Sequence, residues 1–246
     1  MLSRISSPQL AFAVALLLPV VSGCGSGGSP PPAASISSDS PDASASGSPA
    51  KATVAEPVQV RAGVASNNTP AQSPQAAPAP EVLLKTSLGD IRLRLNAEKA
   101  PLTVDNFLSN YVERGFYQGT VFHYVDQGFM VAAGGYTAEL EPKETRAYVR
   151  NEAGNGLKNK RGAVAMARNP DHADSATSQF FINLVDNPSL DRSGDETATA
   201  GYCVFGEVVE GMDVVDRIAG VEVADRGPFP KTPVAPVVIQ AAEWTR

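Results

Sequence analysis

The stretch that decides the fold is Phe122-His123-Tyr124-Val125-Asp126-Gln127-Gly128-Phe129-Met130. It joins two strand candidates, Thr120 to Val125 and Phe129 to Ala133, in which apolar residues dominate. Gly128 lies between them, and glycine commonly marks a turn. The stretch therefore predicts two consecutive strands separated by a turn.

Two more blocks follow further along the chain, G-A-V-A-M-A-R at 162 to 168 and S-Q-F-F-I-N at 178 to 183. Each lies in a short apolar run of strand length, Gly162 to Ala167 and Gln179 to Val185. The remaining strand candidates, each set off by glycine or proline, are Val82 to Thr86, Asp90 to Leu95, Tyr202 to Val208 and Val237 to Trp244.

Two segments have helical periodicity. Pro101 to Arg114 repeats its apolar residues every three or four positions and begins with a proline, which is tolerated there. Met212 to Ile218 is a second, shorter helix. Eight strands suffice for a closed barrel whose interior is filled by side chains, and closure removes exposed strand edges. We therefore expect a mainly β fold, a closed eight-stranded antiparallel barrel capped by two helices.

Taken together, the three blocks resemble the cyclophilin family, whose signature runs F-H-R-x-x-x-G-F-M-x-Q-G-G. The blocks occur here in the family's order and spacing, and the similarity covers residues 81 to 246. It is closest to the bacterial periplasmic branch. The resemblance implies a cyclophilin-type domain over 81 to 246 with peptidyl-prolyl cis-trans isomerase activity.

An isomerase of this type catalyses rotation about the peptide bond that precedes proline. The barrier to this rotation is about 18–20 kcal/mol, and no covalent bond is broken. The enzyme requires a pocket for the proline ring and hydrogen-bond donors, and we expect no cofactor. The resemblance places the catalytic edge at His123 and Tyr124, with Gln179 and His123 framing the groove. The resemblance implies that the substrate is bound by Phe129, Met130, Ala167, Arg168, Gln179, Phe181 and Leu190. We add Tyr202, either as a wall of the groove or as the cap of a strand.

Two positions depart from the signature. Tyr124 stands where the family has its catalytic arginine, and Ala132 stands where it has glutamine. The tyrosine phenol offers one neutral hydrogen-bond donor, whereas the arginine guanidinium offers five cationic ones. Arg168 is the candidate cation to replace the missing arginine. We expect an isomerase with reduced turnover. The alternatives are a proline-peptide binding module or chaperone without turnover, and an inert envelope scaffold, which would have no reason to retain the pocket.

The N-terminus is typical of a secretory signal. Residues 1 to 23 carry one cation, Arg4, and an apolar run from Leu10 to Val21, shorter than the roughly 20 residues of a transmembrane helix. The tail V-S-G-C resembles a bacterial lipobox, which implies lipidation of Cys24; the alternative is an ordinary signal peptide with a chance cysteine. Gly25 is not the aspartate associated with inner-membrane retention, so we expect a lipid-anchored envelope protein, facing the periplasm from the outer membrane.

Residues 24 to 80 are rich in Ser, Ala, Pro and Gly and have no apolar periodicity. Such a composition cannot bury enough surface to offset its ordering entropy, so we expect a disordered tether. With Cys24 lipidated, Cys203 has no partner for a disulfide and is expected to be a small buried strand residue.

Composition limits the other partners. The net charge is −6 and basic residues form no block, which argues against nucleic acid. Two cysteines and two histidines do not form a recognisable zinc pattern, so we expect no metal. We expect a monomer that binds proline-containing unfolded or flexible polypeptides.

Overall fold

The computed structural model describes residues 79–245. The expected signal peptide, the lipidation site Cys24 and the tether up to residue 78 lie outside the described residues. The carbonyl of Pro80 accepts a hydrogen bond from the Leu95 N–H at 2.8 Å.

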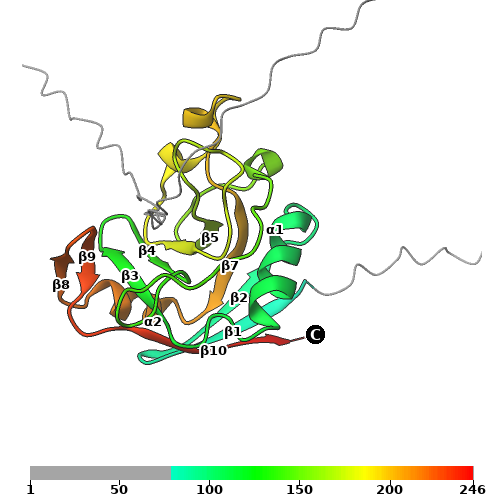
Figure 1. The fold of residues 1–246 in the computed structure, drawn as a ribbon. Helices are drawn as coiled ribbons and strands as arrows, with labels where there is room; N and C mark the ends of the chain where they lie inside the picture. Colours follow the sequence, from blue (N-terminus) through cyan, green and yellow to red (C-terminus); the bar gives the residue numbers. More distant parts are fainter. Residues whose placement is uncertain (1–78, 246) are drawn as a thin grey trace, which may run out of the picture. The chain divides into compact units, whose positions relative to one another are not determined.

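Eight strands close into an antiparallel barrel in the order β1-β10-β3-β4-β6-β5-β7-β2, which confirms the predicted fold class (Figure 1). Their bounds agree with the expected ranges to within a few residues. The strands are β1 (Glu81–Thr86), β2 (Gly89–Leu95), β3 (Thr120–Asp126), β4 (Met130–Ala133), β5 (Ala163–Met166), β6 (Phe180–Asn183), β7 (Val204–Glu210) and β10 (Val238–Thr245).

The strands alternate between two apolar clusters. On β6, Phe180 and Ile182 point into the barrel core, whereas Phe181 belongs to a second cluster on the outer face. Phe122 on β3 is also in the core. The expectation that Phe122 and Phe180 are core residues is confirmed.

Two helical segments pack into the core on opposite sides of the barrel (Figure 1). The first is α1 (Pro101–Asp105), continued by a π-helix (Asn106–Val112), and the second is α2 (Met212–Ala219). Phe107 and Tyr111, four positions apart on this segment, are both fully buried. The predicted helix therefore exists, with π geometry in its second part. Short 3-10 turns occur at Ala153–Asn155, Pro188–Leu190 and Thr197–Thr199.

One element was not predicted. A two-stranded sheet, β8 (Val223–Arg226) and β9 (Phe229–Pro233), lies beside β3 (Figure 1). All four residues of β8 are exposed, and β9 contains two prolines. Neither strand therefore has the alternating apolar pattern on which sequence prediction depends.

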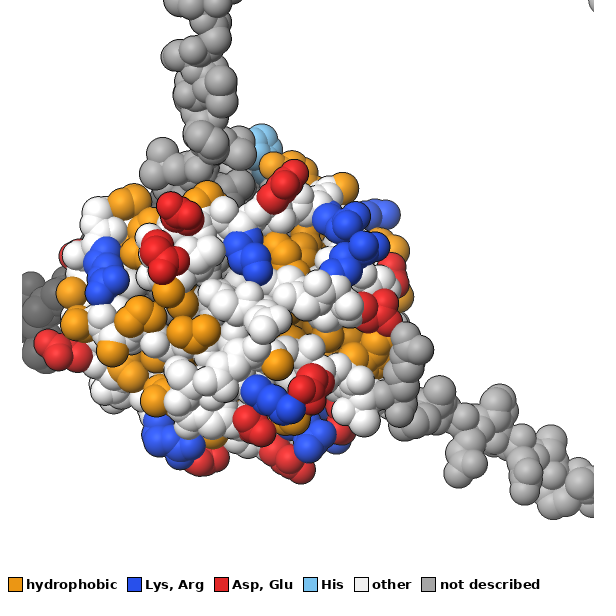
Figure 2. Space-filling model, turned by 60° about the horizontal axis from the view of Figure 1, so that its bottom comes forward, with side chains coloured by type: hydrophobic (Ala, Val, Ile, Leu, Met, Phe, Trp, Pro, Cys, Tyr) orange, Lys and Arg blue, Asp and Glu red, His pale blue; other side chains and the backbone are white. Residues whose placement is uncertain are grey.

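The surface mixes both signs of charge. On the face in Figure 2, basic and acidic side chains are interspersed with apolar ones. Within residues 79–245, no helix is both long and apolar enough to cross a membrane, and no group of three metal-ligating side chains was found.

Candidate active site

The candidate site is a row of side chains on the outer face of the barrel. Antiparallel register places Tyr124 on β3 opposite Ala132 on β4, Ala132 opposite Phe181 on β6, and Phe181 opposite Ala165 on β5. Ala165 in turn pairs with Val204 on β7. Neighbouring strands lie about 4.8 Å apart, so the row forms a continuous apolar floor.

Larger apolar side chains surround this floor. Phe181 meets the Tyr202 ring edge-on, with centroids 5.7 Å apart. The backbone N–H of Tyr202 donates to the Leu190 carbonyl at 2.9 Å, which connects Tyr202 to the 3-10 turn at Pro188–Leu190. Of the predicted contacts, the structure gathers five in one outer cluster: Met130, Ala167, Phe181, Leu190 and Tyr202.

Phe129 was expected to start a strand but lies in the turn before β4. Its backbone carbonyl accepts from the Leu184 N–H at 3.0 Å and from Asn187 Nδ2 at 3.0 Å. The half-buried ring directly precedes Met130. The turn is therefore fixed by the loop after β6, which holds Phe129 and Met130 at one end of the groove.

Tyr124 lies at the edge of the floor and is held by an acid. Its hydroxyl donates to Asp126 Oδ2 at 3.2 Å, and the same oxygen accepts from Lys231 Nζ at 2.6 Å. Burial and, after it, the Asp126 carboxylate raise the pKa of the Tyr124 phenol. The group that replaces the family's arginine is therefore a neutral phenol next to an ion pair.

His123 is placed beneath the groove edge. Its side chain is 4% exposed and packs edge-on against Tyr136, with ring centroids 4.8 Å apart. Burial lowers the pKa of the imidazole to about 4, with a smaller opposing effect from a hydrogen bond to the Val121 backbone. Within the described residues its Nδ1 has no hydrogen-bond partner. Such a side chain offers almost no surface to a peptide, which corrects its expected role at the catalytic edge: it supports that edge from below.

Gln179 is also buried, and its amide hydrogen-bonds the Tyr136 hydroxyl. A Cβ on Gly135 would lie 2.5 Å from Gln179 Cγ, so glycine is required there for the side chain to pack. The backbone of Gln179 accepts from the Ala167 N–H at 2.9 Å. Gln179 thus fixes the end of β5 through its backbone carbonyl, and its role in framing the groove stays a prediction.

Arg168 is not available as a replacement cation. Its guanidinium donates to the carbonyls of Gly201 (2.9 Å), Thr197 (2.9 Å), Asn169 (3.0 Å) and Pro170 (3.2 Å), and it is 9% exposed. It also lies over the Tyr202 ring, 4.9 Å from the centroid. To reach Tyr124 it would have to abandon these carbonyls, so the structure assigns Arg168 to holding the groove wall.

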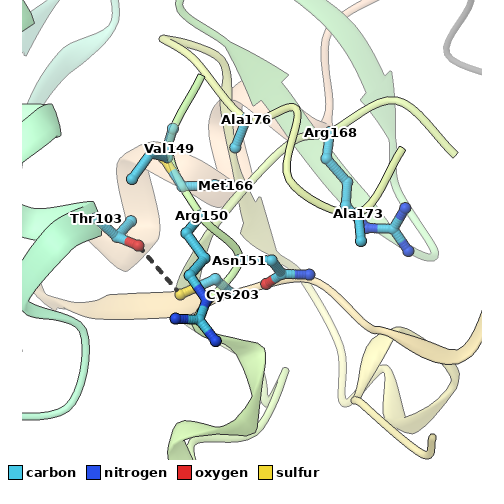
Figure 3. A pocket seen from close by; sticks show the side chains of 9 residues that line it. All are labelled: Thr103, Val149, Arg150, Asn151, Met166, Arg168, Ala173, Ala176 and Cys203. Atoms are coloured by element: carbon cyan, nitrogen blue, oxygen red, sulfur yellow. Dashed lines mark hydrogen bonds between the residues drawn. The ribbon is translucent and has the colours of Figure 1, made fainter. Parts of the chain in front are cut away.

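Behind Arg168 is a narrow hollow that contains Cys203 (Figure 3). The Cys203 thiol is buried, lies 3.4 Å from Thr103 Oγ1, and is free of any disulfide. Burial raises the pKa of this thiol to about 11, which keeps it protonated and unreactive. The expectation of a small buried cysteine is confirmed, although it lies just before β7 rather than within it.

Sequence reasoning missed two kinds of groove residue. Ala165 and Val204 form the floor, and their position follows from period-two alternation once Phe181 is placed on the outer face. Asp126 lay inside the quoted motif but had no assigned role. No sequence pattern indicated a role for Lys231, because the strand that carries it was not predicted.

Comparisons with known proteins identify the family and agree with the fold. The family model described as cyclophilin type peptidyl-prolyl cis-trans isomerase/CLD matches residues 81–244. Peptidyl-prolyl cis-trans isomerase A of Dickeya dadantii is 50% identical over 162 residues, which cover 66% of this chain and 83% of that protein. Peptidyl-prolyl cis-trans isomerase B of Escherichia coli is 48% identical over 160 residues, which cover 65% of this chain and 96% of that protein.

Among solved structures, a cyclophilin type peptidyl-prolyl cis-trans isomerase of Cryptosporidium parvum superposes with a TM-score of 0.56. The two chains are 22% identical, and the match covers 68% of this chain and 98% of that one. At this identity the likeness supports the fold alone.

Proposed function

The chain belongs to the family of cyclophilin-type peptidyl-prolyl cis-trans isomerases, and from that premise we propose that it isomerises X-Pro bonds in envelope proteins with reduced turnover. Isomerase activity itself is the family's activity, named for relatives about 50% identical to this chain. The proposal concerns the rate, the clients and the location.

The observation that carries the proposal is the contrast between the pocket and its edge. The apolar floor, which includes Phe181, and the wall formed by Leu190 and Tyr202 are continuous, as a proline ring requires. At the edge, the Tyr124 hydroxyl is directed to Asp126. A donor near the prolyl nitrogen favours a pyramidal nitrogen and weakens amide resonance. A neutral phenol already engaged by a carboxylate performs this poorly, because hydrogen bonds from charged groups contribute about 1.5–3 kcal/mol and neutral ones about 1.

A second candidate function is supported by the same contact. If Tyr124 remains bound to Asp126 when a peptide is present, the groove binds proline segments without turning them over. The protein would then act as a binding module or chaperone.

NMR exchange spectroscopy on an Ala-Pro peptide separates these functions. With the purified chain, we expect exchange between cis and trans signals that is accelerated over the free peptide, at a rate below that of the Escherichia coli relative measured in parallel. Saturable binding without accelerated exchange would favour the binding module. A rate equal to the relative's would contradict reduced turnover.

We further propose that the protein is a monomer, binds no nucleic acid, and is attached through a lipid on Cys24 to the outer membrane, facing the periplasm. The V-S-G-C sequence before the tether supports this location. Cys24→Ser should move the protein from the membrane fraction to the soluble envelope fraction. Cys203→Ser is the matched control, since Cys203 is buried in the barrel domain and should leave anchoring unchanged. A Cys24→Ser variant that stays in the membrane pellet would exclude this anchor.

A further inference from the structure

Three side chains of the β8–β9 hairpin hold it against β3, one of them through Tyr136. Phe229 packs edge-on against Tyr136, which in turn contacts His123. Thr232 Oγ1 donates to the His123 carbonyl at 2.9 Å. Lys231, which precedes Thr232 in β9, reaches Asp126 Oδ2 with its Nζ at 2.6 Å. The hairpin therefore brings a cation to the strand that carries the groove edge.

Lys231 has an unusual backbone. Its φ is +50°, a left-handed conformation that non-glycine residues rarely adopt; in the described chain Leu140 is the other non-glycine residue with positive φ. The Lys231 N–H donates to Asp225 Oδ1 at 3.0 Å, which stabilises this conformation. Strained backbone of this kind persists where the surrounding structure holds it, often at functional positions.

Asp126 faces the groove. It pairs with Met130 across the β3–β4 ladder, as Tyr124 pairs with Ala132, so both β3 side chains stand on the face that carries the groove floor. Oδ1 of Asp126 accepts from the Gly128 N–H at 3.3 Å, while Oδ2 accepts from both Tyr124 and Lys231. The Asp126 and Lys231 side chains are 20% and 44% exposed, so the pair is partly shielded from water.

We propose that Lys231 is a positioning residue for isomerisation, which acts through Asp126 to present the Tyr124 hydroxyl to the substrate. Lys231 offsets the charge of Asp126, so the phenol can transfer its hydrogen bond from the carboxylate to the peptide. Without Lys231, Asp126 keeps the hydrogen bond of the phenol, and the hydroxyl is not released to the peptide. The three residues thus form a substitute for the single arginine of the family, and the proposal rests on the isomerase function above.

A double-mutant cycle tests this coupling in the purified full chain. Lys231→Met keeps a side chain of similar length and should lower kcat/KM about tenfold, less than the 10²–10³ expected when a catalytic donor itself is deleted. Binding of an Ala-Pro peptide should change less than twofold. In a Tyr124→Phe background the same substitution should change kcat/KM less than twofold, because residues acting as one unit are not additive.

Three controls separate coupling from loss of structure. Lys231→Arg retains the charge and should recover most of the activity. Asp126→Asn combined with Lys231→Met should also recover activity, because no charge is left to offset. Lys85→Met removes an exposed lysine of a similar pair on the opposite half of the barrel and should have no effect. Equal losses in the wild-type and Tyr124→Phe backgrounds, or no loss at all, would overturn the role of Lys231 and leave the isomerase function intact.

A second measurement does not depend on turnover. The ¹³Cζ signal of Tyr124 at neutral pH reports the hydrogen bond of the phenol. Lys231→Met should shift this signal, and Lys85→Met should not. If the wild-type chain accelerates no exchange, the proposed function fails, and this signal still decides the coupling: an unchanged Tyr124 signal in Lys231→Met overturns it.

Discussion

The two halves of the barrel's outer surface obey different rules. On β10, β1, β2 and β7 the outward positions carry charges that pair across strands, such as Lys85 with Glu243 (2.6 Å) and Arg94 with Glu207 (2.6 Å). Across β4, β6, β5 and the start of β7 the outward cluster is apolar and includes Ala132, Phe181, Ala165 and Val204, with the charged Asp126 at its edge on β3. An antiparallel sheet in water normally presents polar residues outward. The half that breaks this rule is the half that carries the groove to which we assign proline binding.

The halves also differ in how their side chains are held. The charged half uses exposed ion pairs, which contribute about 0–1 kcal/mol each. The groove half uses buried contacts and hydrogen bonds to backbone carbonyls, as at Arg168. Substitutions in the groove half should therefore have larger effects on stability, and they alone should affect catalysis.

The largest effect is expected for Phe181→Ala. Phe181 is 2% exposed and contacts Tyr202, so its truncation should lower the free energy of unfolding by about 3–5 kcal/mol and abolish measurable binding of an Ala-Pro peptide. Urea unfolding and peptide titration measure the two effects. Phe181→Leu, which keeps more of the volume, should remain folded and bind weakly. Wild-type affinity in the leucine variant would show that the groove is not the binding site.

Acid should weaken the groove half through His123. The pKa of this imidazole is about 4 in the folded protein and about 6.5 when unfolded, so the unfolded chain takes up a proton first. Stability is then lost as pH falls from about 6.5 towards 4, by up to roughly 3 kcal/mol.

Urea unfolding between pH 7 and pH 4.5 checks this window. In His123→Phe, which keeps a ring against Tyr136, the pH dependence should be smaller than in the wild type. His172→Asn removes the chain's other histidine, which is exposed, and should keep the wild-type slope. If the free energy of unfolding depends on pH equally in His123→Phe and the wild type, the imidazole titrates alike in the folded and unfolded states.

Tyr124→Arg should raise kcat/KM by about tenfold, because a charged donor contributes more than a neutral phenol. Adding Ala132→Gln should increase the gain, since the two positions are opposite each other on β3 and β4. NMR exchange gives the rate, and peptide affinity should stay within a few-fold. An inert Tyr124→Arg variant that also fails to bind peptide would contradict the assigned groove.

The smallest effect is expected on the charged half. Arg94→Ala breaks an exposed pair with Glu207 and should cost less than about 1 kcal/mol of unfolding free energy. Isomerase activity should be unchanged. A loss comparable to that of Phe181→Ala would remove the energetic distinction between the two halves.

Much of this contrast was accessible from sequence. Period-two alternation separates Phe180 from Phe181, and it places one in the core and the other on the outer face. The same motif that identifies the groove also reveals Tyr124 and Ala132 as departures. Local patterns are sufficient here because strand geometry alone determines which face a side chain occupies.

Local sequence patterns could not predict hydrogen bonds and ion pairs between residues that lie far apart in the chain. Lys231 meets Asp126 across 105 positions, from a hairpin with no alternating pattern. Arg168 was a candidate cation until the structure placed four carbonyls around it, and His123 was a catalytic candidate until its burial was known. Sequence determined the barrel, the groove and the missing arginine, because each depends on residue type and spacing. The tertiary structure decided which charges surround the groove, because hydrogen-bond partners depend on packing between segments that are not neighbours in the chain.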